Sequence, residues 1–257
     1  MKFAEMTSPQ IAGVDREKSV VVVPIAAVEQ HGPHLPTGTD TIICGSLAEA
    51  VEKQLSDSVV LLPTLWLGAS AHHLRFGATL DGQLSNYINV LQDIAKSLLY
   101  DNFQRLLFLN GHGGNVDPLK VALRQIQLEF PEALLVGGSY WSTADDLLRE
   151  KLEGPHKFIG HACEFETSMI MHLRPELVDE AKLADAGELV SDNINGLFIA
   201  RDMKHRTKQG CTGTPNLATA AKGEHLFTGI VERLVQSVEK MLNEPLGTEY
   251  QDFVNGP

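Results

Sequence analysis

The first clear pattern in the chain is a continuous apolar run, rich in β-branched residues, from Val20 to Val28. A run without alternating polar positions predicts a strand that is buried on both faces of a parallel sheet. From Thr39 to Leu55 the apolar residues instead recur on one helical stripe, and Asp40 is suited to cap the start of that helix. A buried strand followed by a helix is therefore predicted at the start of the chain.

The same alternation recurs further along. Short apolar runs predict strands and helical stripes predict helices, in the order strand 59–62, helix 84–100, strand 106–109, helix 116–130 and strand 134–137. Strands and helices that alternate at these lengths form βαβ crossovers, which place helices on both faces of a parallel sheet. We therefore expect an α/β fold, a three-layer αβα sandwich with a largely parallel central sheet.

The pattern is weaker after Tyr140. Helices are predicted at 145–152 and 225–242, the apolar run 167–173 fits either a strand or a helix, and 187–213 is irregular. α/β folds of about 250 residues often form one unit, and no repeat, low-complexity tract or linker marks a boundary. We therefore expect a single domain over residues 1–257.

Composition and charge narrow the class of protein. The chain is 43% hydrophobic and 21% charged, as in globular proteins, and its net charge of −12 without a basic cluster argues against nucleic acid or an anionic membrane as a partner. Its three cysteines are scattered, its N-terminus lacks a signal-peptide pattern, and no apolar run approaches the ~20 residues of a membrane span. We expect a cytoplasmic protein.

Polar residues that can bind a metal follow two of the predicted strands. Glu29 and His31 come after the first strand and would project to the same side of an extended segment, with Asp40 nine residues beyond His31. His112 follows strand 106–109 in a glycine-rich segment. Because ligands bind outside the carboxyl ends of strands in such sheets, we expect these four side chains to converge. The simpler alternatives are a helix cap for Asp40 and exposed loop positions for the others.

A third polar group lies between Gly160 and Ser168. His161 is followed by Glu164 and Glu166, enough for a general base and a further metal ligand, although isolated glutamates more often form surface ion pairs. Cys163 fits a small packed residue better than a nucleophile. In the His112 segment, Gly113 belongs to a glycine-rich turn whose backbone N–H groups could hold an oxyanion.

At this point the chain resembles the creatininase (creatinine amidohydrolase) family. The matching segments run in order from about residue 20 to 225: 28–36 with 38–41, 110–115, 161–168, and 214–215 with 218–219 and 222–223. The resemblance implies a metal-dependent hydrolase with an αβα sandwich, two divalent metal ions (Zn, Mn or Fe), a small-molecule substrate and a homo-oligomer, often a hexamer.

The resemblance also implies roles for single residues. It makes Glu29, Asp40 and His112 ligands of one metal, makes Asp40 the bridge to a second metal held by His31, and matches His161 to the catalytic histidine. Creatininase has a glutamate two residues after the histidine that matches His112, whereas this chain has Gly114. Another carboxylate must then complete the second site: Glu166 is the choice and Glu164 the alternative. A Glu164 that binds no metal would orient His161 or bind substrate.

The remaining site residues are expected to bind the substrate. Ser70 and His73 lie in a loop that resembles the substrate side of the family, although two histidines in a loop are at least as often surface residues. Gly113 is a further candidate. Trp141, with Tyr140, could close the pocket, although an aromatic residue there is more often in the core. We expect metal-activated water to cleave a C–N bond of a cyclic amide or formamide, with creatinine itself in doubt because of Gly114. The alternatives are cleavage of a C–C bond in a cyclic polyol ketone and a metal-binding protein without catalysis.

Overall fold

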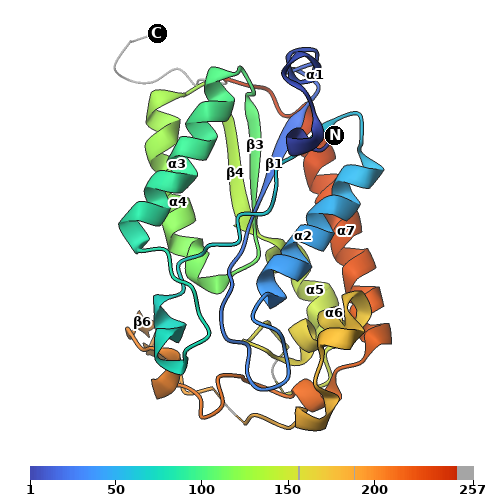
Figure 1. Ribbon diagram of the computed structural model, residues 1–257. Helices are drawn as coiled ribbons and strands as arrows, with labels where there is room; N and C mark the ends of the chain where they lie inside the picture. The colour runs from blue at the N-terminus through green and yellow to red at the C-terminus, as the bar shows by residue number, and fades with distance from the viewer. Residues whose placement is uncertain (156, 188, 248–257) are drawn as a thin grey trace.

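The apolar run at Val20 forms β1 (Val20–Ile25), an inner strand of the central sheet (Figure 1). The computed structural model describes residues 1–155, 157–187 and 189–247. The sheet has four parallel strands in the order β2-β1-β3-β4, the others being β2 (Val59–Leu61), β3 (Arg105–Asn110) and β4 (Leu134–Ser139). Every residue of β1, β2 and β3 is buried, as expected for strands covered on both faces.

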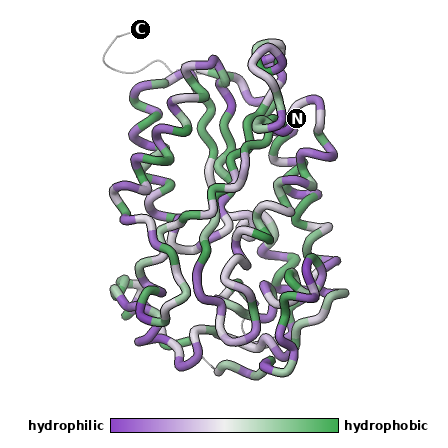
Figure 2. Tube along the Cα trace, in the orientation of Figure 1, coloured by the Kyte–Doolittle hydropathy of each residue, from purple (hydrophilic) through white to green (hydrophobic). Residues whose placement is uncertain are grey.

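Helices cover both faces of this sheet. One layer contains α3 (Leu84–Tyr100) and α4 (Val116–Glu129), and the other contains α2 (Thr39–Gln54), α6 (Glu164–Leu173) and α7 (Ala220–Asn243). The sheet separates two apolar cores, one under each layer. Figure 2 shows hydrophobic strands between helices that carry hydrophilic residues as well. The predicted three-layer αβα fold with a parallel central sheet is confirmed.

Shorter elements join these layers. They are α1 (Ser8–Ala12), α5 (Asp145–Lys151), an antiparallel pair of β5 (Asn193–Ile194) and β6 (Leu197–Phe198), and the 3-10 helices η1 (Phe3–Glu5), η2 (Ala71–Phe76), η3 (Gly113–Asn115), η4 (Tyr140–Thr143), η5 (Pro175–Leu177), η6 (Glu180–Lys182), η7 (Met203–His205) and η8 (Pro215–Leu217). Within the described residues, none of the helices has both the length and the apolar character needed to cross a membrane.

The structure differs from the predicted elements in two places near the first strand. β1 ends at Ile25 rather than Val28, because Ala26 N donates to Leu65 O at 2.9 Å and leaves the regular sheet pairing. Asp40 does not cap α2, contrary to the prediction. The helix starts after Gly38, whose carbonyl accepts from Ile42 N at 2.9 Å, and Asp40 lies in its first turn with its carboxylate directed elsewhere.

Candidate metal centre and active site

The carboxyl ends of β1 and β3 are neighbours, and this brings two of the polar segments together. Ile25 pairs with Asn110 in the sheet, and Gly111 N donates to Ile25 O at 2.8 Å. The first two turns of α2 pack against the same place: a Cβ on Gly111 would lie 2.5 Å from Cys44 Cβ and 3.3 Å from Asp40 O. Only glycine allows this approach, which brings Asp40 next to the residues that follow both strands.

Glu29, Asp40 and His112 form the first group of candidate ligands. His112 Nδ1 lies 3.3 Å from Glu29 Oε1 and 3.1 Å from Asp40 Oδ2. All three side chains are buried, and one potential ligand atom from each lies within 4.8 Å of the others. Two carboxylates and an imidazole at this separation suit Zn²⁺, Mn²⁺ or Fe²⁺.

His31, Asp40 and Glu166 form the second group. His31 Nε2 lies 3.1 Å from Asp40 Oδ1 and 4.0 Å from Glu166 Oε1. Glu166 comes from the first turn of α6, and its other oxygen accepts from Ala162 N at 2.5 Å. Asp40 therefore directs one carboxylate oxygen to each group.

Contacts behind the rings orient both histidines. His31 Nδ1 lies 3.1 Å from Glu29 O, and His112 Nε2 lies 3.2 Å from Ala69 O. With these nitrogens turned to backbone carbonyls, His31 Nε2 and His112 Nδ1 face the carboxylates and are the ring atoms that would bind a metal in place of a proton. Backbone carbonyls commonly fix the tautomer of metal-binding histidines in this way.

The electrostatics of the cluster also suit a cation. Three buried carboxylates lie together, and Glu29 Oε2 has no hydrogen-bond partner among the described residues. Burial, with Asp40 and Glu29 close by, raises the pKa of Glu166 to about 7 although His31 opposes this. Burial lowers the pKa of His31, but Asp40, Glu166 and Glu29 outweigh it and raise the pKa to about 9. Glu166 and His31 thus hold protons that offset the negative charge of the carboxylates. A divalent ion bound at the same place would offset that charge instead.

His161 and His73 lie beside the first group. His161 Nδ1 is 3.6 Å and His73 Nε2 is 3.4 Å from Glu29 Oε1, and the His161 ring centroid lies 4.2 Å from that of His31. Burial, together with the His31 and His73 rings, holds the pKa of His161 well below its ordinary value. The His161 imidazole is therefore neutral near pH 7 and can accept a proton.

These residues border a cavity of about 350 Å³. Its walls include the predicted residues His73, Gly113 and Trp141, together with residues that the sequence did not single out: His72, Met203 and Arg206. Gln30 was missed as well. Its Nε2 lies 2.7 Å from His73 Nδ1 and donates to Gly210 O at 3.0 Å. The place of Gln30 between Glu29 and His31 could have identified it as a site residue. Arg206 lies in the irregular region 187–213, where the sequence offers no such signal.

Ser70 does not face this cavity, in contrast to its expected role in substrate binding. Its Oγ lies 3.3 Å from His112 Nε2, on the side of the ring away from the carboxylates, and its backbone N donates to Asp81 Oδ1 at 2.8 Å. Ser70 is fully buried. The structure therefore places Ser70 behind a candidate ligand, where it supports the ring.

Glu164 is likewise separate from the metal cluster. Its carboxylate accepts from Glu153 N and Gly154 N, each at 2.9 Å, and pairs with the Lys222 ammonium. Burial raises its pKa, but Lys222 and these N–H groups outweigh that effect and lower it. The expectation that Glu164 orients the His161 ring finds no contact: the His161 ring nitrogens face Glu29 and Gln30.

Gly114 has a steric reason to lack a side chain. A Cβ at this position would lie 2.1 Å from Ala69 O and 2.6 Å from His112 Nε2. No carboxylate can be supplied from here without moving the backbone behind His112. The carboxylate beside His31 comes from α6 instead.

The fold and the site together define an α/β protein with a candidate metal centre at the carboxyl edge of a parallel sheet. The family model described as creatinine amidohydrolase matches residues 4–238, so the chain belongs to the creatininase family of hydrolases.

Two relatives in this family have curated activities. The mycofactocin precursor peptide peptidase of Mycolicibacterium smegmatis is 32% identical over 231 residues, 86% of this chain and 85% of the relative. The creatinine amidohydrolase of Pseudomonas putida is 28% identical over 237 residues, 86% of this chain and 89% of the relative. Both names denote cleavage of C–N bonds, one in a peptide and one in a cyclic compound.

Solved creatininases share the fold. A mutant creatininase of Zn-Zn type has a TM-score of 0.79 at 23% identity and covers 95% of this chain and 98% of its own. A structure described as creatininase Mn has a TM-score of 0.78 at 23% identity, with 95% and 99% covered.

Proposed function

We propose that this chain is a metal-dependent amidohydrolase that uses two divalent ions, Zn, Mn or Fe, to cleave a C–N bond of a small amide. The observation that carries the proposal is Asp40, whose two oxygens face two separate groups of candidate ligands. The names of two structural relatives include zinc and manganese, which supports these two ions. The names of the two sequence relatives support cleavage of a C–N bond.

The ligands divide into two sets that share Asp40. Glu29 and His112 would hold one ion and His31 and Glu166 the other. Two divalent ions held there would lower the pKa of bound water and polarise a substrate carbonyl.

The remaining residues position the substrate and move a proton. His161 is neutral and adjacent to Glu29, so it can take the proton released by the attacking water and deliver it to the leaving nitrogen. His73, Gly113 and Trp141 form walls of the cavity and are the proposed substrate contacts. No Ser or Cys nucleophile is required, and Cys163 is buried with a pKa raised by that burial to about 12.

The test combines metal analysis with an activity screen. We expect about two ions per chain after loading, and hydrolysis in a panel of lactams, formamides, short peptides and cyclic polyol ketones that stops on chelation and returns with metal. Turnover of the ketones alone would replace the C–N bond by the C–C alternative. A loaded chain that retains no metal would refute the proposal.

A pair of variants tests the second ion. Glu166→Gln is expected to lose about one ion per chain, since it removes one ligand of the second set. Glu164→Gln is the matched control, because it lies on the same helical turn and pairs with Lys222 instead. Loss of metal in the control variant only would exchange the two roles.

Assembly and location belong to the same proposal. The family resemblance predicts a homo-oligomer, such as a hexamer. The composition predicts a cytoplasmic location. Light scattering of the purified chain measures the first, and a monomer would contradict it.

A further inference from the structure

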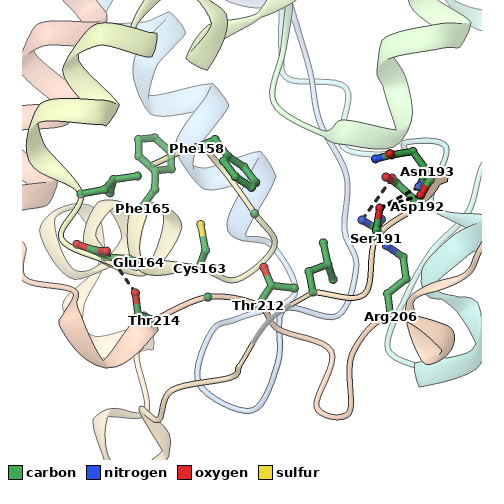
Figure 3. A pocket seen from close by; sticks show the side chains of 14 residues that line it. Phe158, Cys163, Glu164, Phe165, Ser191, Asp192, Asn193, Arg206, Thr212 and Thr214 are labelled. Carbon is green, nitrogen blue, oxygen red and sulfur yellow. Dashed lines mark hydrogen bonds and ion pairs between the residues drawn. The ribbon is translucent and has the colours of Figure 1, made fainter. Parts of the chain in front are cut away.

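A second cavity of about 390 Å³ adjoins the candidate metal site (Figure 3). Phe158, Gly160, Leu189, Asp192 and Arg206 line both cavities, so the two are neighbours that share a wall. Pockets of about 300–1,000 Å³ enclose drug-sized ligands. The two cavities together thus provide more room than a compact cyclic amide needs.

The second cavity is suited to an apolar group. Leu152, Cys163 and Phe165 add apolar walls to those of Phe158 and Leu189. Its one buried acid, Glu164, is already paired with Lys222 and with two backbone N–H groups. The cavity therefore offers an apolar volume without an uncompensated carboxylate.

The shared wall carries a polar pair, Arg206 and Asp192, beside its apolar residues. Arg206 Nη2 lies 3.3 Å from Asp192 Oδ2, and Arg206 Nε donates to Val190 O at 3.2 Å. Figure 3 shows this pair on the opposite side of the cavity from Glu164 and Phe165. A ligand that spans both cavities would keep polar main-chain atoms at Arg206 and place its apolar group beyond them.

The second cavity lies on the His161 side of the metal cluster. Gly160 lines both cavities, and His161 N donates to Thr212 Oγ1 at 2.9 Å in the wall of the second. In hydrolysis, the oxygen of water bonds to the carbonyl carbon, the C–N bond breaks, and the nitrogen gains a proton and leaves as an amine. Because His161 delivers that proton, the amine half of the substrate lies on the same side.

We propose that the second cavity binds a large apolar side chain on the amine half of the substrate. This inference rests on the proposed amidohydrolase function and narrows its substrate class. The substrate is then a linear amide whose amine half resembles a leucine or phenylalanine residue, rather than a compact lactam.

The kinetic test holds the acyl group constant and changes the amine half. The metal-loaded chain is assayed with N-formylphenylalaninamide, N-formylleucinamide and N-formylglycinamide. We expect kcat/KM for the two large substrates to exceed that for the glycine compound by at least about tenfold, the effect of even one methylene in a hydrophobic pocket. Equal values for all three would overturn the proposal.

Ser191 allows matched variants in the cavity wall. Its Oγ lies 3.1 Å from both Asn193 N and Asn193 O, contacts that Ser191→Ala and Ser191→Trp both remove, but only tryptophan adds volume. We expect the phenylalanine-to-glycine ratio of kcat/KM to persist in Ser191→Ala and to fall close to one in Ser191→Trp. The same ratio in both variants would count against the cavity.

A binding measurement separates this proposal from the proposed function. N-acetylphenylalaninamide and N-acetylglycinamide are titrated calorimetrically into the metal-free chain and both Ser191 variants. Tighter binding of the phenylalanine compound, weakened at least about tenfold by Ser191→Trp only, supports the subsite even if the chain hydrolyses nothing. Indistinguishable binding of the two compounds would refute the subsite while leaving the metal centre to its own test.

Discussion

Asp40 is the residue on which both halves of the candidate metal centre depend, since its two oxygens face different ligand groups. Asp40→Ala should therefore lose both ions, whereas His31→Ala should lose chiefly the one it shares with Glu166. Elemental analysis after equal loading measures this difference. Equal metal retention in the two variants would refute a bridging role for Asp40.

His161 should serve the chemistry rather than hold metal. We expect His161→Ala to keep near-normal metal content and to lower kcat by about 10²–10⁴, the usual scale for a positioned proton shuttle. Steady-state kinetics and metal analysis on the same preparation provide the two readouts. If the variant loses an ion, His161 is a ligand through the Nδ1 atom that faces Glu29.

Gly114 and Gly113 are adjacent and differ sharply in the space around them. A Cβ on Gly114 would lie 2.1 Å from Ala69 O, whereas a Cβ on Gly113 would meet no atom within 4 Å. Gly114→Ala should lower the free energy of unfolding by about 1–3 kcal/mol, as overpacking does. Gly113→Ala is the control, and denaturant unfolding that shows equal stability for both variants would contradict the steric account.

At the scale of single residues, the sequence could predict the place of side chains that directly follow the end of a strand. Glu29, His31 and His112 follow strand ends, and the structure brings them together with Asp40 and Glu166, although their roles remain predictions. Ser70 and Glu164 could not be placed from the sequence, because neither the loop around Ser70 nor the segment 160–168 has a clear period that specifies which way a side chain points. Arg206 was missed for the same reason.

Two helices are joined by a buried ion pair at their first turns. Glu164 starts α6 and pairs with Lys222 near the start of α7. Among the described residues, Glu164→Gln should leave the Lys222 ammonium with the exposed Glu153 as its one acidic partner. It should cost about 3 kcal/mol of stability, near the lower end for breaking a buried pair. Thermal and urea unfolding measure the loss, with metal content as a second readout.

The double variant Glu164→Gln/Lys222→Gln provides the control for this prediction. It removes the uncompensated charge and should recover part of the lost stability. A double variant that is less stable than the single one would contradict the account and assign Lys222 a separate role.

Elements with a clear period were predictable, and short ones were not. Helix 84–100 matches α3 in both ends because its apolar stripe spans several turns. The run 167–173 is too short for its period to distinguish strand from helix, and it belongs to α6. The small β5–β6 pair escaped notice because its two-residue strands carry no repeating pattern.

Metal binding should stabilise the whole molecule, because the candidate ligands join the ends of β1 and β3 to α2 and α6. Saturation at 100 times the dissociation constant adds about 2.7 kcal/mol to the free energy of unfolding. We expect chelation to lower the melting temperature and re-addition of Zn²⁺ or Mn²⁺ to restore it. Calorimetric scans unaffected by either step would count against a built metal site.

The pH dependence of metal uptake has a definite sign. In the metal-free chain the pKa of Glu166 is raised from 4.5 to about 7, and that of His31 from 6.5 to about 9. Both groups bind protons more tightly when folded, so their contributions favour folding at low pH and are lost as pH rises through these values. Metal must displace the same protons, so its affinity should rise between about pH 6 and 9.

Proton release measures this coupling directly. Titration of the metal-free chain with Zn²⁺ in two buffers of different ionisation enthalpy should show protons released at pH 7, and fewer in Glu166→Gln. Uptake of metal with no proton release at pH 7 would contradict the raised pKa values.

The two groups of candidate ligands are also completed at different times during translation. Glu29, Asp40 and His112 are all present once β3 and the turn after it have been made, whereas the group around His31 needs Glu166 from α6. At about 5–20 residues per second, translation reaches the second group a few seconds after the first. The order of synthesis thus provides one complete set of ligands before the other, and a nascent chain has the means to hold a single ion before it can hold a pair.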